Sequence, residues 1–179
     1  FVVVPERRPD FDLDALKDAF QQAFERIWRG DAENDGFNDL ILAAGLDWRQ
    51  TAMLRACCKY LLQTGVPFSQ AYMEQTLCKY PLHARLLVEL FEAKFDPARE
   101  QPSRTVADAA RKRMARELAP LFGEEMDRLH PHLIESLGAV RGEARERQVE
   151  AAVKAIGAVM DSVESVYEDR ILRSFMAVI

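Results

Sequence analysis

Apolar residues recur every three or four positions along most of the chain, which is the period of a helix with one buried face. Only "FVVV" at the start looks extended, and four residues cannot make a sheet by themselves. The pattern therefore predicts an all-α fold, an irregular multi-helix domain with several long helices behind a short extended stretch. The first apolar stripe consists of Leu13, Leu16, Phe20, Phe24 and Ile27, and Gly30 ends that helix.

The second predicted helix is short, and the third is long. Phe37, Leu40, Ile41 and Ala44 indicate a short helix that Gly45 stops. For the third helix, Asp47 is a predicted N-cap, and Gln50 three residues later can complete a variant of the capping box. Gly65 ends it. Its predicted buried face comprises Met53, Leu54, Cys57, Cys58, Leu61 and Leu62.

Two further helices are predicted before residue 97. Ser69 is the expected N-cap of the fourth, with Phe68 placed to pack on Met73 as a hydrophobic staple. Pro81 begins the fifth helix, which "KFDP" ends. Its apolar side contains Leu82, Leu86, Leu90 and Phe91, whereas His83 is expected on the surface near the helix start.

The second half of the chain is predicted to hold longer helices between two polar joints, "AREQPSR" and "GAVRGEARERQ". Between these joints an apolar period runs from Val106 to Leu133, and prolines at 120 and 131 should kink or break that helix. Another helix carries Val149, Val153, Ile156 and Met160. Ser165 and Glu168 make a Ser-x-x-Glu capping box for a last helix that continues to Ile179.

The chain is expected to have three parts, and the first of the two joints begins the third. Residues 1–11 form an extended N-terminal remnant, and residues 12–97 form a first helical subdomain. Residues 98–179 form a long-helix subdomain. No internal repeat of constant period is visible.

Composition narrows the classes of function. The 179 residues are 49% apolar and 30% charged, which is typical of a soluble globular protein. A net charge of −5 weighs against a nucleic-acid partner, and the basic stretch "ARKRMAR" is interspersed with acidic residues. No apolar run approaches the roughly 20 residues that span a bilayer, so no membrane partner is expected. Three cysteines, two of them adjacent, indicate reduced thiols in a cytoplasmic protein.

The turn "RGDAENDGFNDLIL" resembles a calcium-binding loop in part. Asp31, Glu33 and Asp35 alternate, and Gly36 follows where an EF-hand loop turns sharply. The twelfth position, however, holds Leu42 instead of the bidentate glutamate. We therefore expect no calcium there and interpret the segment as a polar turn between two helices.

Other chemistry is also sparse. His130 and His132 flank a proline without further nearby ligands, so a metal site is not expected. The eight glycines are scattered, whereas a dinucleotide cradle needs them clustered so that backbone N–H groups approach phosphate. No Ser/His/Asp or Cys/His set that would activate a nucleophile can be assembled from the sequence. The sequence thus assigns no catalytic, cofactor-binding or metal-ligating residue to this chain.

The same turn carries a family resemblance. "WRGDAENDGFNDLILAAGLDWRQTAMLRACCKYLLQTGVPFSQAYM", residues 28–73, closely resembles part of the large bacterial NAD-specific glutamate dehydrogenases. The matching motifs are "ENDGFN", "AGLDWR", "LRACCKYL" and "FSQ", and the resemblance resumes at "ARLLVELFEAKFDP" and "EDRILRSF". Cys57-Cys58 replaces a commoner pairing of small and aromatic residues. The stretch from 102 to 164 is not distinctive.

The resemblance implies a parent enzyme that oxidises L-glutamate to 2-oxoglutarate and ammonium with NAD. It implies that the subdomain at residues 98–179 leads towards a catalytic domain absent from this chain, with the catalytic motifs beyond Ile179. This segment alone should therefore be inactive and should hold no cofactor. The segment would be a non-catalytic helical linker or regulatory scaffold. Its partners would be other domains of the parent chain, in an enzyme that forms a homo-oligomer. The alternative function is a free-standing helical protein-interaction module.

Overall fold

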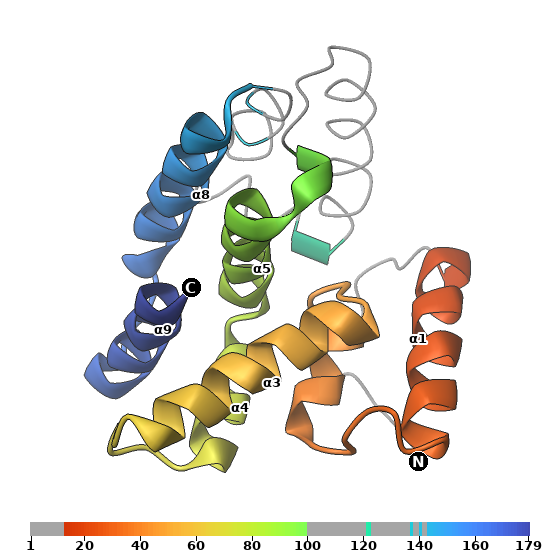
Figure 1. The fold of residues 1–179 in the computed structure, drawn as a ribbon. Helices are drawn as coiled ribbons and strands as arrows, with labels where there is room; N and C mark the ends of the chain where they lie inside the picture. The colour runs from red at the N-terminus through yellow and green to blue at the C-terminus, as the bar shows by residue number, and fades with distance from the viewer. Residues whose placement is uncertain (1–12, 100–120, 123–136, 138–139, 141–142) are drawn as a thin grey trace.

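A computed structural model of the chain describes residues 13–99, 121–122, 137, 140 and 143–179 (Figure 1). Every regular element in these residues is a helix, which confirms the all-α prediction. The elements are α1 (Leu13–Trp28), the 3-10 helix η1 (Gly36–Asp39), α2 (Leu40–Ala43), α3 (Trp48–Gln63), α4 (Gln70–Lys79), α5 (Pro81–Phe95), the 3-10 helix η2 (Pro97–Arg99), α8 (Arg145–Met160) and α9 (Val166–Val178).

Helix α5 lies at the centre of the helical body. It contacts α3, α4, α9 and, most extensively, α8, which runs beside it (Figure 1). Nine consecutive residues, from Leu82 to Leu90, are buried. The prediction of one apolar side was therefore incomplete, since α5 is surrounded by protein over these residues and even the polar His83, Arg85 and Glu89 are buried.

Local sequence determines where the helices end. Gly30 and Gly65 have φ of +78°, the left-handed conformation that glycine adopts without steric cost at a helix C-terminus. At the start of α3 the predicted capping box is present: Asp47 Oδ1 accepts from the N–H groups of Arg49 and Gln50, and Gln50 Oε1 accepts from the Asp47 N–H. Ser69 caps α4 as predicted by accepting from Tyr72.

Loss of a cap should destabilise the fold modestly. Asp47→Ala and Ser165→Ala each remove a side-chain acceptor at a helix start, so we expect each to lower the free energy of unfolding by about 1 kcal/mol. Urea denaturation followed by circular dichroism measures the change. Lys154→Ala, on the exposed side of α8, is the control and should stay within about 0.5 kcal/mol of wild type. Cap variants that melt with the control would contradict the assigned helix starts.

The apolar period misplaced several side chains. Leu62 and Val153 were predicted on buried faces but are 38% and 37% exposed, while the polar Thr51 and Arg55 are buried in α3. On α1, Phe20 and Phe24 of the predicted stripe are exposed, whereas Ile27 is half-buried. Whether these side chains are buried depends on the neighbouring helices, and the apolar period of a single helix carries no information about them.

Several predictions lie outside the described residues. These are the extended stretch at 1–11, the helix from Val106 to Leu133 with its breaks at Pro120 and Pro131, and the pair His130 and His132. The division into parts at residues 12–97 and 98–179 stays a prediction.

Candidate functional site

The acidic turn between α1 and η1 is the most elaborate polar feature of the structure. Each of its three alternating carboxylates faces a basic side chain from α1 or α3. Asp31 pairs with Arg26 at 3.0 Å, Glu33 pairs with Lys59, and Asp35 pairs with Arg55 at 2.6 Å. The carboxylates therefore tie the turn to two helices.

Arg55 is the buried centre of this arrangement. Its Nε donates to Asp35 Oδ2 at 2.6 Å and its Nη2 to Asp35 Oδ1 at 2.7 Å, a bidentate pair. Nη2 also donates to Asn38 Oδ1 and to the Glu33 carbonyl oxygen. The Arg55 side chain is 6% exposed and that of Asp35 14%. One guanidinium thus binds three residues of "ENDGFN".

The remaining letters of the motif also have structural roles. Asp35 caps η1 by accepting from the Phe37 N–H, and the Phe37 ring is fully buried. Gly36 lies against Glu74 of α4, where an added Cβ would come within 2.6 Å of the Glu74 Oε2 atom and displace that carboxylate. The Gly36 carbonyl oxygen accepts from the Cys78 thiol. The specific sequence "ENDGFN" is therefore explained by two needs: polar groups that bind the buried Arg55, and the buried Phe37 ring beside them.

A second polar cluster joins α9 to the junction of α4 and α5. Glu168 accepts from Lys79 Nζ at 2.8 and 2.9 Å and from the Tyr80 hydroxyl at 2.7 Å. Burial opposes the charge on Glu168, but the hydrogen bonds from Lys79 and Tyr80 outweigh it and hold its pKa below the ordinary value. The capping box predicted at the start of α9 is therefore half formed. Ser165 accepts from the Glu168 N–H, whereas the Glu168 carboxylate is used by Lys79 and Tyr80.

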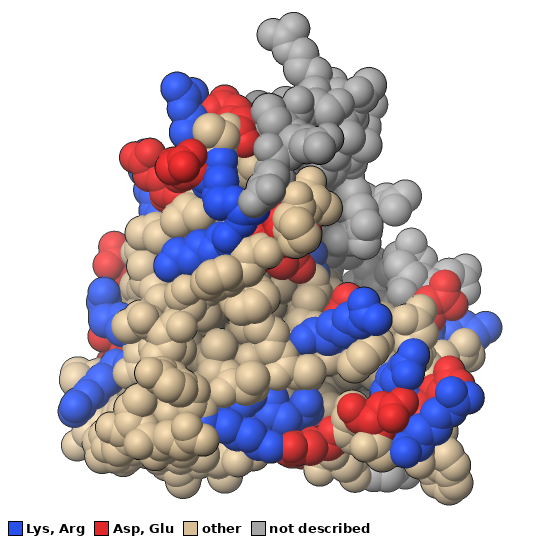
Figure 2. All heavy atoms as spheres, viewed as in Figure 1, with Lys and Arg blue, Asp and Glu red and all other residues tan. Residues whose placement is uncertain are grey.

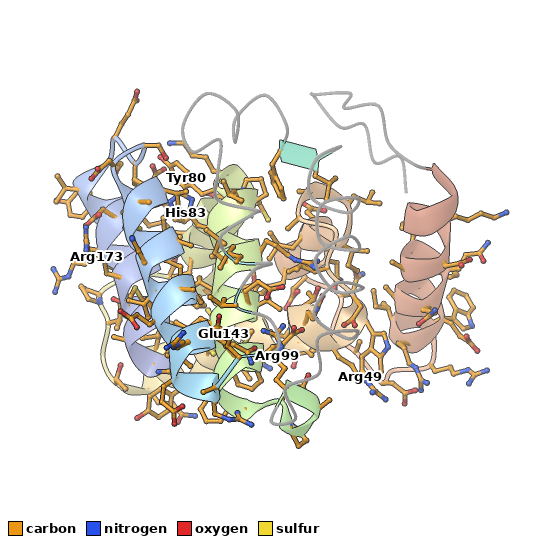
Figure 3. The ribbon with its side chains drawn as sticks, turned by 90° about the horizontal axis from the view of Figure 1, so that it is seen from above. Arg49, Tyr80, His83, Arg99, Glu143 and Arg173 are labelled. Carbon is orange, nitrogen blue, oxygen red and sulfur yellow. The ribbon has the colours of Figure 1, made fainter. Side chains whose placement is uncertain are left out.

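His83 lies beside this cluster, between α5 and α8 (Figure 3). The prediction that it is a surface residue was wrong, since it is 1% exposed. Its Nε2 is 3.1 Å from the Val159 carbonyl oxygen, and its Nδ1 has no hydrogen-bond partner among the described residues. Burial lowers the pKa of His83 to about 4, although the Val159 contact opposes that shift. The neutral ring is therefore a packing element of the α5–α8 interface.

Side chains at the start of α8 form hydrogen bonds with the C-terminal end of α5 and the residues after it. Arg145 donates to the Ala93, Lys94 and Asp96 carbonyl oxygens, three groups near a helix C-terminus that need partners. Gln148 Nε2 donates to the carbonyl oxygens of Arg99, at 3.3 Å, and of Glu143, at 2.9 Å. Figure 3 shows Arg99 and Glu143 at this end of the molecule. The two polar joints predicted from sequence meet here.

Arg99 adds an ionic contact at the same place. Its guanidinium donates to Glu89 at 3.1 Å and also contacts Glu92, and its side chain is only 9% exposed. The joint after α5 is therefore anchored in its described part.

The cysteine thiols are poorly suited to nucleophilic chemistry. Burial, assisted by Glu74 and Asp35, raises the pKa of Cys58 to about 11. Burial, assisted by Asp39 and Glu74, raises that of Cys78 to about 12, and burial also raises the pKa of Cys57. All three are free thiols, and raised pKa values leave them protonated near neutral pH.

Taken together, these clusters join helices. Among the described residues, no group of three or more histidine, cysteine, aspartate or glutamate side chains is placed to hold a metal ion. The described helices include none with the length and apolar content to cross a membrane. On the face in Figure 2, acidic and basic side chains are interspersed. Sequence reasoning missed the role of Arg55 and the contacts of Glu168 with Lys79 and Tyr80, because these partners are 20 and 88–89 residues away.

Comparison with known proteins gives this helical body a family. Residues 32–97 match the family model described as glutamate dehydrogenase, helical motif 3. The chain is 45% identical over 93 residues (52% of this chain) to the NAD-specific glutamate dehydrogenase of Halomonas elongata, and 35% identical over 160 residues (89% of this chain) to that of Mycobacterium tuberculosis. No solved structure matches significantly.

The matches cover only a small part of each relative. The aligned regions amount to 6% of the Halomonas enzyme and 7% of the Mycobacterium enzyme. A third relative, the NAD-specific glutamate dehydrogenase of Pseudomonas aeruginosa, is 39% identical over 103 residues, or 58% of this chain and 6% of its own length. The matched segment contains Glu33 and Asp35 of the acidic turn, Arg55 and all of α5. The chain is therefore a segment of the kind found in large bacterial NAD-specific glutamate dehydrogenases.

Proposed function

We propose that this chain is a non-catalytic helical scaffold within an enzyme that oxidises L-glutamate with NAD. The observation that carries the proposal is the match of residues 32–97 to a helical motif of glutamate dehydrogenases. The whole enzyme would convert glutamate, NAD and water to 2-oxoglutarate, ammonium and NADH. This segment would supply rigidity between neighbouring domains, and not a reacting group.

The contacts within the body support a rigid role. Buried or half-buried ion pairs connect the turn at residues 31–38 to α3, α9 to the α4–α5 junction, and η2 to α5. Arg145 and Gln148 fasten α8 to the other end of α5. A body fastened at both ends of its central helix moves as a unit, which is how a shift of one domain is passed to the next.

The 179-residue chain alone should neither bind NAD nor oxidise glutamate. Hydride transfer needs the nicotinamide held against the substrate by a dedicated fold, and this sequence has no glycine-rich phosphate turn. Thermal unfolding with millimolar NAD should show an unchanged Tm, because a ligand that does not bind the native state cannot stabilise it. Absorbance of NADH should not rise when glutamate and NAD are added.

The full-length polypeptide is the matched control. It should form NADH in a glutamate-dependent manner, and NAD should raise its Tm. A full-length protein without this activity would contradict the proposed enzyme and favour the free-standing interaction module. An NAD-dependent Tm shift in the 179-residue chain would contradict the non-catalytic role.

A further inference from the structure

Three aromatic side chains form a row along the outer side of α1. Phe20, Phe24 and Trp28 are 43%, 52% and 81% exposed. Their rings are roughly parallel, with centroids 6.5 Å apart for the first pair and 6.1 Å for the second. Side chains four positions apart lie over one another on a helix, so the three rings make one continuous strip, called here the α1 aromatic row.

The helices that the structure describes leave the row exposed. Helix α1 packs at the edge of the molecule against α2 and α3 (Figure 1), and Ala23 is the one buried residue among its described side chains. Scattered exposed apolar residues are common, whereas a contiguous apolar patch of a few hundred Å² is often functional. Glu25 and Arg29 form an ion pair beside it, so the flank has no single sign of charge. An apolar partner fits this surface better than a charged one.

The area of the row helps to decide between two possible apolar partners, a second copy of this chain and another domain of the same polypeptide. At these exposures the three rings offer roughly 300–400 Å². A stable complex between separate proteins buries roughly 800 Å² on each partner, so the row is too small to hold two copies of this chain together. Interfaces between domains of one polypeptide are smaller, because the covalent chain supplies the proximity. The matched relatives extend far beyond this segment, which is 6–7% of their length.

We propose that the α1 aromatic row docks into an apolar groove on another domain of the same longer polypeptide. The proposal rests on the proposed function, since it needs a parent enzyme. Trp28 is the most exposed of the three and lies at the end of the helix. Rigid aromatic rings bury large area at low entropic cost, so Trp28 is the expected anchor of the contact.

Hydroxyl-radical footprinting with mass spectrometry tests the docking. The rate of Trp28 oxidation is measured in the 179-residue chain and in the full-length polypeptide, each normalised to Tyr60, an aromatic residue of α3 that is 55% exposed. We expect Trp28 to be oxidised at least fivefold more slowly in the full-length protein. In that protein, Phe24→Asp should restore rapid oxidation of Trp28, because a carboxylate in the groove opposes docking.

A matched variant controls for the added charge. Gln22 is exposed and lies two positions before Phe24, on the opposite side of the helix. Gln22→Asp in the full-length protein should leave Trp28 protected. Restored oxidation in both variants would overturn the proposal, because the protection would then depend on α1 itself and not on the row.

Two other outcomes would also overturn the proposal. One is an equal rate of Trp28 oxidation in the two proteins. The other is protection in the 179-residue chain that grows with its concentration, together with a dimer in sedimentation, which would assign the row to a second copy. NADH formation is assayed on the same full-length sample. Unprotected Trp28 in an active enzyme refutes only the docking, whereas absent activity refutes the proposed function.

Discussion

Replacing Arg55 by alanine should lower the free energy of unfolding by roughly 3–5 kcal/mol, the cost of breaking a buried ion pair from one side. The truncation leaves the Asp35 carboxylate, 14% exposed, without its bidentate partner. It also removes the donor to Asn38 and to the Glu33 carbonyl oxygen. Urea denaturation of the 179-residue chain measures the loss. The turn at residues 31–38 should lose amide protection first, because Arg55 connects it to α3.

A neighbouring ion pair in the same turn is the control. Lys59 pairs with Glu33, but these side chains are 48% and 54% exposed. Exposed pairs are worth roughly 0–1 kcal/mol, so Lys59→Ala should be nearly silent. In an Asp35→Asn background, which keeps the cap but removes the buried charge, Arg55→Ala should cost clearly less. Equal effects of Arg55→Ala and Lys59→Ala would show that burial of Arg55 has no energetic consequence.

The second large effect expected is a loss of stability in mild acid that originates at His83. Its pKa is lowered from 6.5 to about 4 in the fold, chiefly by burial. Between these values the unfolded chain binds a proton that the folded chain does not, so stability rises with pH across this window. The contribution is complete above about pH 6.5 and is lost as pH falls to about 4. A shift of this size corresponds to roughly 3 kcal/mol.

A variant isolates this contribution from the carboxylates that titrate in the same range. His83→Gln keeps a donor for the Val159 carbonyl oxygen but has no titrating ring. The unfolding free energies of wild type and variant, measured by urea denaturation at pH 7, 6, 5 and 4.5, should converge as the pH falls. The decrease should be larger for wild type. Parallel pH profiles would mean that His83 titrates alike in the folded and unfolded chains.

Local signals predicted local structure well. The capping box at Asp47 and Gln50, the Ser69 cap and the glycines that end α1 and α3 were all readable, because each depends on residues within a few positions. The start of α5 at Pro81 was predicted for the same reason, since proline suits the first turn of a helix.

Features that depend on distant partners were not predicted. The burial of His83 depends on α8, whose Val159 is 76 residues away. The role of Arg55 depends on Asp35, and an arginine in a helix is ordinarily expected at the surface. The aromatic residues of α1 have the spacing of a buried stripe, and the period alone cannot distinguish a face that meets the core from one that meets another domain.

The contacts of Gln148 have a topological consequence. Because one side-chain amide reaches the carbonyl oxygens of both Arg99 and Glu143, these two residues lie close together although they are far apart in sequence. Phe122 and Leu137, which lie between them in sequence, belong to the core. The contacts of Gln148 keep Arg99 and Glu143 close together whatever the length of the sequence between them. Doubling the length of a loop whose ends are held together costs only about 0.6 kcal/mol of closure entropy. A longer or shorter connection between Arg99 and Glu143 should therefore change the closure entropy little while α5 and α8 keep their register.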